Sequence, residues 1–95
     1  MASNQKVGSH KTTIFTDDSG FINVVYHSTP VVKFNDQKII LDTGGWYSNT
    51  TKLRMNQASN QFNLGYRVFQ KKGKWFISFP DKTIDFVDKA VIDRE

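Results

Sequence analysis

The sequence predicts a small α+β domain, an antiparallel β-sheet of hairpins with one central α-helix packed on one face. Three observations carry this expectation. Residues 66–71 and 74–79 are two arms whose side chains alternate between two faces on either side of Lys72-Gly73, which is typical of a tight β-hairpin. Residues 51–62 follow several good helix-starting residues and carry apolar side chains at helical spacing. A length of 95 residues supports one modest core and is too short for two.

The first half of the chain predicts strands separated by turns. Asp17-Asp18-Ser19-Gly20 is a turn pattern, because Asp side chains bond the local backbone and Gly accepts a positive φ. Residues 21–27 are rich in β-branched and aromatic side chains and predict a strand. A hairpin is expected next, with arms at residues 31–34 and 38–41.

The helix is expected over residues 51–62. Its start is open by a residue or two, because Ser48, Asn49 and Thr50 are all good N-cap residues. Gly65 is well placed to end the helix, since glycine adopts the left-handed conformation without strain.

The second half predicts a β-meander. The arms at residues 66–71 and 74–79 form one hairpin, in which Arg67, Phe69 and Lys71 share a face. A last short strand is expected around residues 84–86. The predicted organisation is a flexible lead over residues 1–11, a single α+β domain over residues 12–87 and a frayed tail over residues 88–95.

The composition and the motifs argue against catalysis and against a bound metal or cofactor. Without cysteine the chain has no disulfide framework, thiolate metal site or thiol nucleophile. No carboxylate is placed by the sequence to orient His27 as a catalytic base. Gly44-Gly45 lacks the lysine of a phosphate-binding loop, so we interpret the pair as a tight bend closed by Trp46. We therefore expect no catalytic residues, no metal and no cofactor; a small hydrolase or nucleotide-binding enzyme is the weakest of three hypotheses.

Positive charge is concentrated in one segment. Residues 43–80 contain six Lys or Arg and no acidic residue. Lys52 and Arg54 lie in the first turns of the expected helix, where the helix dipole disfavours cations. If the helix start and the hairpin share a face, these side chains can follow a nucleic-acid backbone. The predicted contacts to nucleic acid are Lys52, Arg54, Arg67, Lys71, Lys72 and Lys74.

Amides and one aromatic residue could add contacts to bases. Asn56, Gln57 and Asn60 carry donors and acceptors that can pair with base edges. Phe69 alternates with basic residues, so it is the aromatic side chain most suited to stack on a base from a basic outer face. Burial of Phe69 in the core is the competing interpretation, because a small domain needs most of its aromatic residues as core.

An interaction with a protein is the alternative function. Lysines at a hairpin tip also protect an exposed edge from unwanted strand pairing. On this interpretation the protein is a protein–protein interaction module that binds or inhibits a host enzyme or defence complex, using a sheet edge or an aromatic face. The oligomeric state is left open.

Several strings in this chain resemble a group of short bacteriophage proteins. They are Leu41-Asp42-Thr43-Gly44-Gly45-Trp46, then Thr50-Thr51-Lys52-Leu53-Arg54-Met55-Asn56-Gln57, and then Tyr66-Arg67-Val68-Phe69-Gln70. The resemblance implies a phage-encoded protein that acts in the cytoplasm of a bacterial host, and it brings no known active site. No apolar run is long enough to cross a membrane, and the first residues lack the apolar stretch of a secretory signal.

Overall fold

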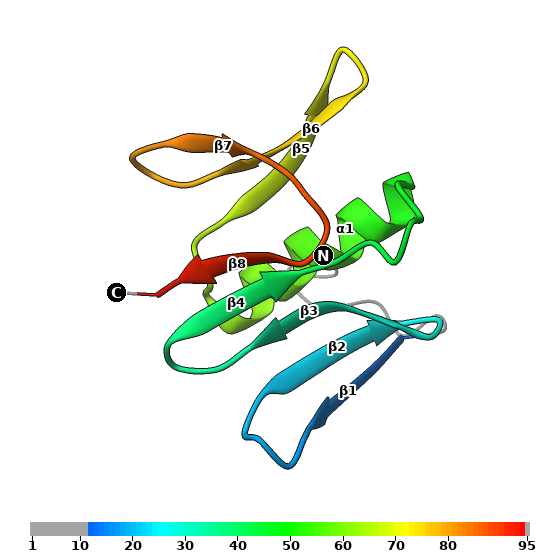
Figure 1. Ribbon diagram of the computed structural model, residues 1–95, viewed down its shortest axis with the longest axis vertical. Helices are drawn as coiled ribbons and strands as arrows, with labels where there is room; N and C mark the ends of the chain where they lie inside the picture. The colour runs from blue at the N-terminus through cyan, green and yellow to red at the C-terminus, as the bar shows by residue number, and fades with distance from the viewer. Residues whose placement is uncertain (1–11, 95) are drawn as a thin grey trace.

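The computed structural model describes residues 12–94, and within that range it contains eight strands and one helix (Figure 1). The flexible lead expected over residues 1–11 lies outside the described residues. In chain order the elements are β1 (Thr12–Thr16), β2 (Ile22–Tyr26), β3 (Thr29–Phe34), β4 (Lys38–Leu41), α1 (Asn49–Phe62), β5 (Arg67–Lys71), β6 (Lys74–Ser78), β7 (Thr83–Asp85) and β8 (Ala90–Asp93).

The strands form two antiparallel sheets. The first has five strands in the order β1-β2-β3-β4-β8, and the second has three in the order β5-β6-β7. Helix α1 packs against β2 and β3 of the first sheet and against β5 of the second, so it connects the two sheets (Figure 1). The predicted α+β class is confirmed, and the hairpins divide between two sheets on either side of the helix.

The hairpin turns follow from local side-chain chemistry. In the β1–β2 turn the Asp17 carboxylate accepts hydrogen bonds from two following backbone N–H groups, at 2.9 and 3.0 Å. In the β3–β4 turn the side-chain oxygen of Asn35 does the same, at 2.8 Å in both cases. Between β5 and β6 both turn residues have positive φ, 52° at Lys72 and 78° at Gly73. Positive φ at both central residues defines the two-residue type I′ turn, whose twist matches that of the flanking strands.

Helix α1 is capped at its N-terminus by a side chain and at its C-terminus by a residue in the left-handed conformation. Ser48 is the N-cap, and its Oγ accepts a hydrogen bond from the Thr51 N–H at 3.1 Å. The helix ends because Asn63 takes the left-handed conformation, with φ 56°. The prediction that Gly65 is the terminating residue is therefore wrong by two positions. Asn also adopts the left-handed region, so it stops the helix before the glycine is reached.

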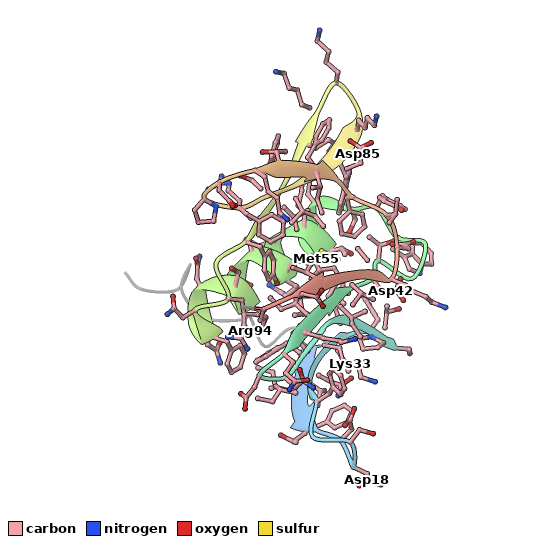
Figure 2. All side chains as sticks on the ribbon, turned by 60° about the vertical axis from the view of Figure 1, so that its left-hand side comes forward. Asp18, Lys33, Asp42, Met55, Asp85 and Arg94 are labelled. Atoms are coloured by element: carbon pink, nitrogen blue, oxygen red, sulfur yellow. The ribbon has the colours of Figure 1, made fainter. Side chains whose placement is uncertain are left out.

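The core lies around α1, between the two sheets. Met55 is fully buried and sits at the centre of the side chains in Figure 2. The first sheet contributes buried residues of β2, β3 and β4, and the second contributes the face of β5 and β6 that points toward the helix. The buried apolar residues around Met55 include Val24, Val32, Ile39, Leu41, Ala58, Tyr66, Val68, Trp75 and Ile77.

The C-terminal segment differs from the expectation. Residues 88–95 were expected to fray, but Ala90–Asp93 form β8 and pair with β4. Ile92 lies opposite the buried Ile39, and the Arg94 guanidinium donates to the Asn35 carbonyl at 2.7 Å. The physical reason is an alternation of Ala90 and Ile92 that completes the core face of the sheet. The charged residues on either side of residues 90–92 masked that alternation in the sequence.

Candidate functional site

Four of the predicted site residues lie on the outer face of the β5–β6 hairpin. The ladder places Phe69 opposite Phe76 and Lys71 opposite Lys74. Residues directly opposite one another in an antiparallel pair point to the same side of the sheet. We call the side formed by Arg67, Phe69, Lys71, Lys74 and Phe76 the hairpin face. On the other side of the same two strands, Val68, Trp75 and Ile77 are buried against the core.

Two aromatic rings form the centre of the hairpin face. The ring of Phe69 stacks on the ring of Phe76 with their centroids 5.4 Å apart and 25° between their planes. Both side chains are half-buried, and neither belongs to the core cluster. The ammonium group of Lys74 lies 5.9 Å from the Phe76 ring centroid. The result is an apolar strip on the protein surface with a cation above one end.

The charge around this strip is mostly positive. Arg67, Lys71 and Lys74 on the face, and Lys72 in the turn, are all exposed. Lys74 forms an ion pair with Asp85 at 3.5 Å, but both side chains are about two-thirds exposed, at 65% and 64%. An ion pair this exposed contributes little and is easily exchanged for another anion. The acidic turn that contains Asp18 lies at the far end of the molecule from the sheet that carries Asp85 (Figure 2).

Lys52 lies close to the hairpin but on its other side. Its ammonium group donates to the Gln70 side-chain oxygen at 3.1 Å and lies 5.2 Å from the ring centroid of Trp75. Gln70 and Trp75 alternate with the residues of the hairpin face, so Lys52 contacts the opposite side of the same two strands. The helix start and the hairpin are therefore in contact. Lys52 and the hairpin face, however, lie on opposite sides of β5 and β6 and do not form one flat surface.

Arg54 does not belong to the exposed basic surface. It is only 7% exposed, and its guanidinium donates to Thr12 Oγ1 and to Gln57 Oε1, both at 3.1 Å. It also lies 5.5 Å from the ring centroid of Tyr26. The prediction that Arg54 contacts nucleic acid is corrected here, because the guanidinium is committed to attaching α1 to β1 and β2. Thr12 and Tyr26 lie outside the helix, which explains how a cation is tolerated in its first turns.

The three amides predicted to contact bases lie elsewhere. The Asn56 side chain donates to the Val68 carbonyl at 2.8 Å and accepts from the Val68 N–H at 2.7 Å, so it attaches the helix to β5. Gln57 is 7% exposed and accepts from Arg54. Asn60 is exposed on the helix, away from the ladder of the hairpin face, and already has an interaction within the chain. Of the four candidate base contacts, Phe69 alone lies on the hairpin face.

The comparisons with known proteins give a family and no activity. The family model of the Kyanoviridae Gp96 protein matches residues 1–93. The chain belongs to the Kyanoviridae Gp96 family. No curated protein and no solved structure matches it. Membership of the Gp96 family confirms the phage origin that the sequence resemblance implied. The likeness of the individual strings quoted for that resemblance stays a prediction. The family description names no substrate and no partner.

One aromatic residue of this Gp96 family member was misread from its sequence, and one was overlooked. Trp46 is 74% exposed, so the expectation that its indole closes the bend at Gly44-Gly45 is wrong. Phe76 was not among the predicted site residues. A signal for Phe76 was present, because a two-residue turn at Lys72-Gly73 fixes a register that puts Phe76 opposite Phe69.

Other kinds of site find little support within residues 12–94. In that range no group of three or more His, Cys, Asp or Glu side chains is arranged to hold a metal ion. The helix there is too short and too polar to cross a membrane. His27 is exposed, lies edge-on to the Tyr26 ring with centroids 4.4 Å apart, and has a positive φ of 57°.

Proposed function

We propose that this phage protein binds single-stranded nucleic acid on the hairpin face, in the cytoplasm of its bacterial host. The observation that carries the proposal is the stacked pair of Phe69 and Phe76 on an exposed sheet face with basic side chains around it. Aromatic side chains on such a surface stack on unpaired bases, and nearby cations neutralise the phosphates. Duplex bases are already stacked on one another, so this chemistry favours single strands.

The expected mechanism divides the work between rings and charges. Stacking of a base on an aromatic side chain contributes roughly 1–3 kcal/mol and tolerates any base. Arg67, Lys71, Lys72 and Lys74 would contact the backbone, where each neutralised phosphate releases condensed counterions. Lys74 can leave Asp85 for a phosphate at small cost, because the ion pair is exposed.

The Phe69–Phe76 pair also has a structural role that must be separated from binding. A cross-strand aromatic pair contributes roughly 0.2–1 kcal/mol to a hairpin. Many other apolar cross-strand pairs would stabilise the hairpin to the same extent, and none of them requires basic residues on the same face. The combination of stacked rings and exposed cations is what the binding proposal explains and hairpin stability alone does not.

A protein partner is the second candidate function, and a different surface favours it. Within residues 12–94 strand β8 pairs with β4 on one side only, so its other edge is open. Val91 on this strand is 57% exposed, and the nearby Val87 and Ile84 are 60% and 38% exposed. Val91 and Ile84 also border a groove of about 660 Å³ between β8 and the β6–β7 turn. An open edge beside exposed apolar residues is suited to the addition of a strand from another protein.

A salt titration distinguishes the two functions. Fluorescence anisotropy of labelled single-stranded DNA and RNA, repeated at increasing salt, is expected to show affinity that falls steeply with salt, with a log–log slope of about −0.7 for each phosphate contacted. A duplex of the same length is expected to bind more weakly. Absence of binding at low salt, or an affinity independent of salt, would contradict the proposal. Co-purification of a bacterial protein from a nuclease-treated lysate would then support the second candidate.

A further inference from the structure

A cavity of about 380 Å³ lies beside the N-terminus of α1, between two loops. One wall is the β2–β3 turn, with Tyr26, His27 and Thr29; the other is the segment before α1, with Thr43, Trp46 and Ser48. Figure 1 shows both segments on the same side of the molecule. The volume falls within the range of about 300–1,000 Å³ that is usual for small-molecule sites.

Both walls of the cavity contain residues with positive backbone φ angles. His27, Gly44 and Gly45 all have positive φ, at 57°, 65° and 90°. A side chain at Gly44 would collide with Thr29, so the two loops are packed directly against each other. A non-glycine residue at positive φ is strained, and the surrounding structure has to hold it there. The cavity is therefore built into the fold, which lowers the entropic cost of filling it.

The largest exposed ring in the cavity is the indole of Trp46. At 74% exposure it leaves most of its apolar surface in water, which is unfavourable for a tryptophan. Tyr26 and His27 add two more rings, and Thr29 and Ser48 add hydroxyl groups. Flat rings together with hydroxyl groups suit a planar heterocycle that can stack on one side and form hydrogen bonds at its edge.

The charge near the cavity argues against an anion. The Asp88 carboxylate accepts hydrogen bonds from the Thr43 N–H at 2.8 Å and from the Thr43 hydroxyl at 2.7 Å. Asp42 accepts from the Gly44 N–H at 2.9 Å. These carboxylates occupy backbone donors beside the cavity and would repel a phosphate. A neutral ligand is favoured.

We infer that this cavity binds a single unstacked nucleobase, held on the indole of Trp46. The inference rests on the proposed function, because the base would belong to the strand bound at the hairpin. A row of contacts connects the two places: Tyr47 lies edge-on to Trp75 with centroids 5.0 Å apart, and Lys52 lies over Trp75 and contacts Gln70. Because Trp75 lies on the side of β5 and β6 opposite the hairpin face, the strand would pass around the hairpin to reach Lys52 and Tyr47.

Uncharged nucleosides test the cavity without the hairpin face. Trp46 is exposed and Trp75 is 6% exposed, so quenching of the solvent-exposed part of the tryptophan emission reports on Trp46. Adenosine, guanosine, cytidine or uridine is expected to quench this emission saturably. Ligand-observed saturation-transfer NMR is expected to show that Trp46→Ala weakens nucleoside binding at least about five-fold, the lower end of what one stacked base contributes. Leu53→Ala, an exposed residue outside the cavity, is the matched control and should bind as the wild type does.

The outcomes separate this inference from the proposed function. Nucleoside binding by wild type that is unchanged in Phe69→Ala supports the cavity, even if oligonucleotides do not bind at all. Oligonucleotide binding without any nucleoside binding leaves the hairpin proposal standing and overturns the cavity. Quenching by N-acetylphenylalaninamide but not by nucleosides also overturns it, and would assign the cavity to a protein side chain. Equal nucleoside affinity of Trp46→Ala and wild type contradicts it as well.

Discussion

Phe69 and Phe76 stack across the β5–β6 ladder with their ring centroids 5.4 Å apart, on the side of the hairpin that faces away from the core. Three of their neighbours along the strands on that side, Arg67, Lys71 and Lys74, are exposed cations. The opposite side of the same strands contains Val68 and Ile77, which are fully buried. A two-stranded ribbon thus presents an apolar core face and an aromatic, basic outer face.

Replacement of Phe69 by Ala is expected to weaken binding of single-stranded oligonucleotides by roughly 1–3 kcal/mol, because one stacked base is lost. Phe76→Ala should have a similar effect, since the two rings form one platform. The measurement is the dissociation constant by fluorescence anisotropy, with circular dichroism to confirm that the variants are folded. Phe15→Ala is the control, because Phe15 is an exposed aromatic residue on β1 in the other sheet. Equal affinity for Phe69→Ala, Phe15→Ala and wild type would refute the role of the ring.

Replacement of Arg67, Lys71 or Lys74 by Gln is expected to reduce the salt dependence of binding. Each lost phosphate contact lowers the magnitude of the log–log slope by about 0.7 for a single strand. The affinity of each variant for oligonucleotides should fall to a similar extent whatever their base sequence, because phosphate contacts do not distinguish between bases. Lys38→Gln, an exposed position on β4, should leave the slope as it is in wild type. A slope that changes equally in the Lys38 variant would show that only net charge matters.

Replacement of Arg54 by Ala is expected to destabilise the fold and to spare binding. The substitution removes the buried guanidinium and with it the hydrogen bonds to Thr12 and Gln57. The expected cost is about 1–3 kcal/mol, measured by urea unfolding. Arg54→Lys should also be less stable than wild type, because an ammonium group cannot reproduce the fork of donors. Weaker oligonucleotide binding at unchanged stability would return Arg54 to the binding surface.

Arg54 shows what local sequence patterns can and cannot predict. Its position in the first turns of a helix was correctly derived from the N-cap residues and the apolar spacing. Its burial depends on β1 and β2, which lie far away in the chain and close over the guanidinium only in the folded protein. An apparently unfavourable charge therefore looked functional, because its structural partners were invisible in the sequence.

The hairpin face was more predictable because it is local. Alternation along residues 66–71 correctly put Arg67, Phe69 and Lys71 on one face, and the turn at Lys72-Gly73 determines the register with β6. By contrast, β8 pairs with a strand about fifty residues earlier in the chain, and no pattern within residues 88–95 identifies that partner. Trp46 was misread for a related reason, since its exposure depends on how two separate loops meet.

Tyr66 is expected to make the protein sensitive to alkaline pH. Burial raises the pKa of its hydroxyl above the ordinary value of 10.0, and the hydroxyl donates to the Met55 carbonyl at 2.7 Å. Below pH 10 Tyr66 is protonated in both states, and its contribution to stability is complete. Above pH 10 the unfolded chain loses a proton that the folded chain retains, so the free energy of unfolding falls by about 1.4 kcal/mol per pH unit from this residue.

Urea unfolding at several values above pH 10 measures this effect. Tyr66→Phe should lose roughly 0.5–1.5 kcal/mol at neutral pH with its hydrogen bond, and its stability should then decline less steeply with pH than that of wild type. Parallel pH profiles for the two proteins would show that Tyr66 ionises as readily in the folded state as in the unfolded one.

The central claim is that single-stranded nucleic acid occupies the hairpin face. NMR titration of the isotope-labelled protein with an unlabelled oligothymidine tests it most directly, through backbone amide and aromatic ring signals. We expect the ring signals of Phe69 and Phe76 and the amides around Arg67 and Lys71 to shift at low salt, and β8 to stay unchanged. Shifts confined to β7 and β8, or no shifts at all at low salt, would contradict the claim.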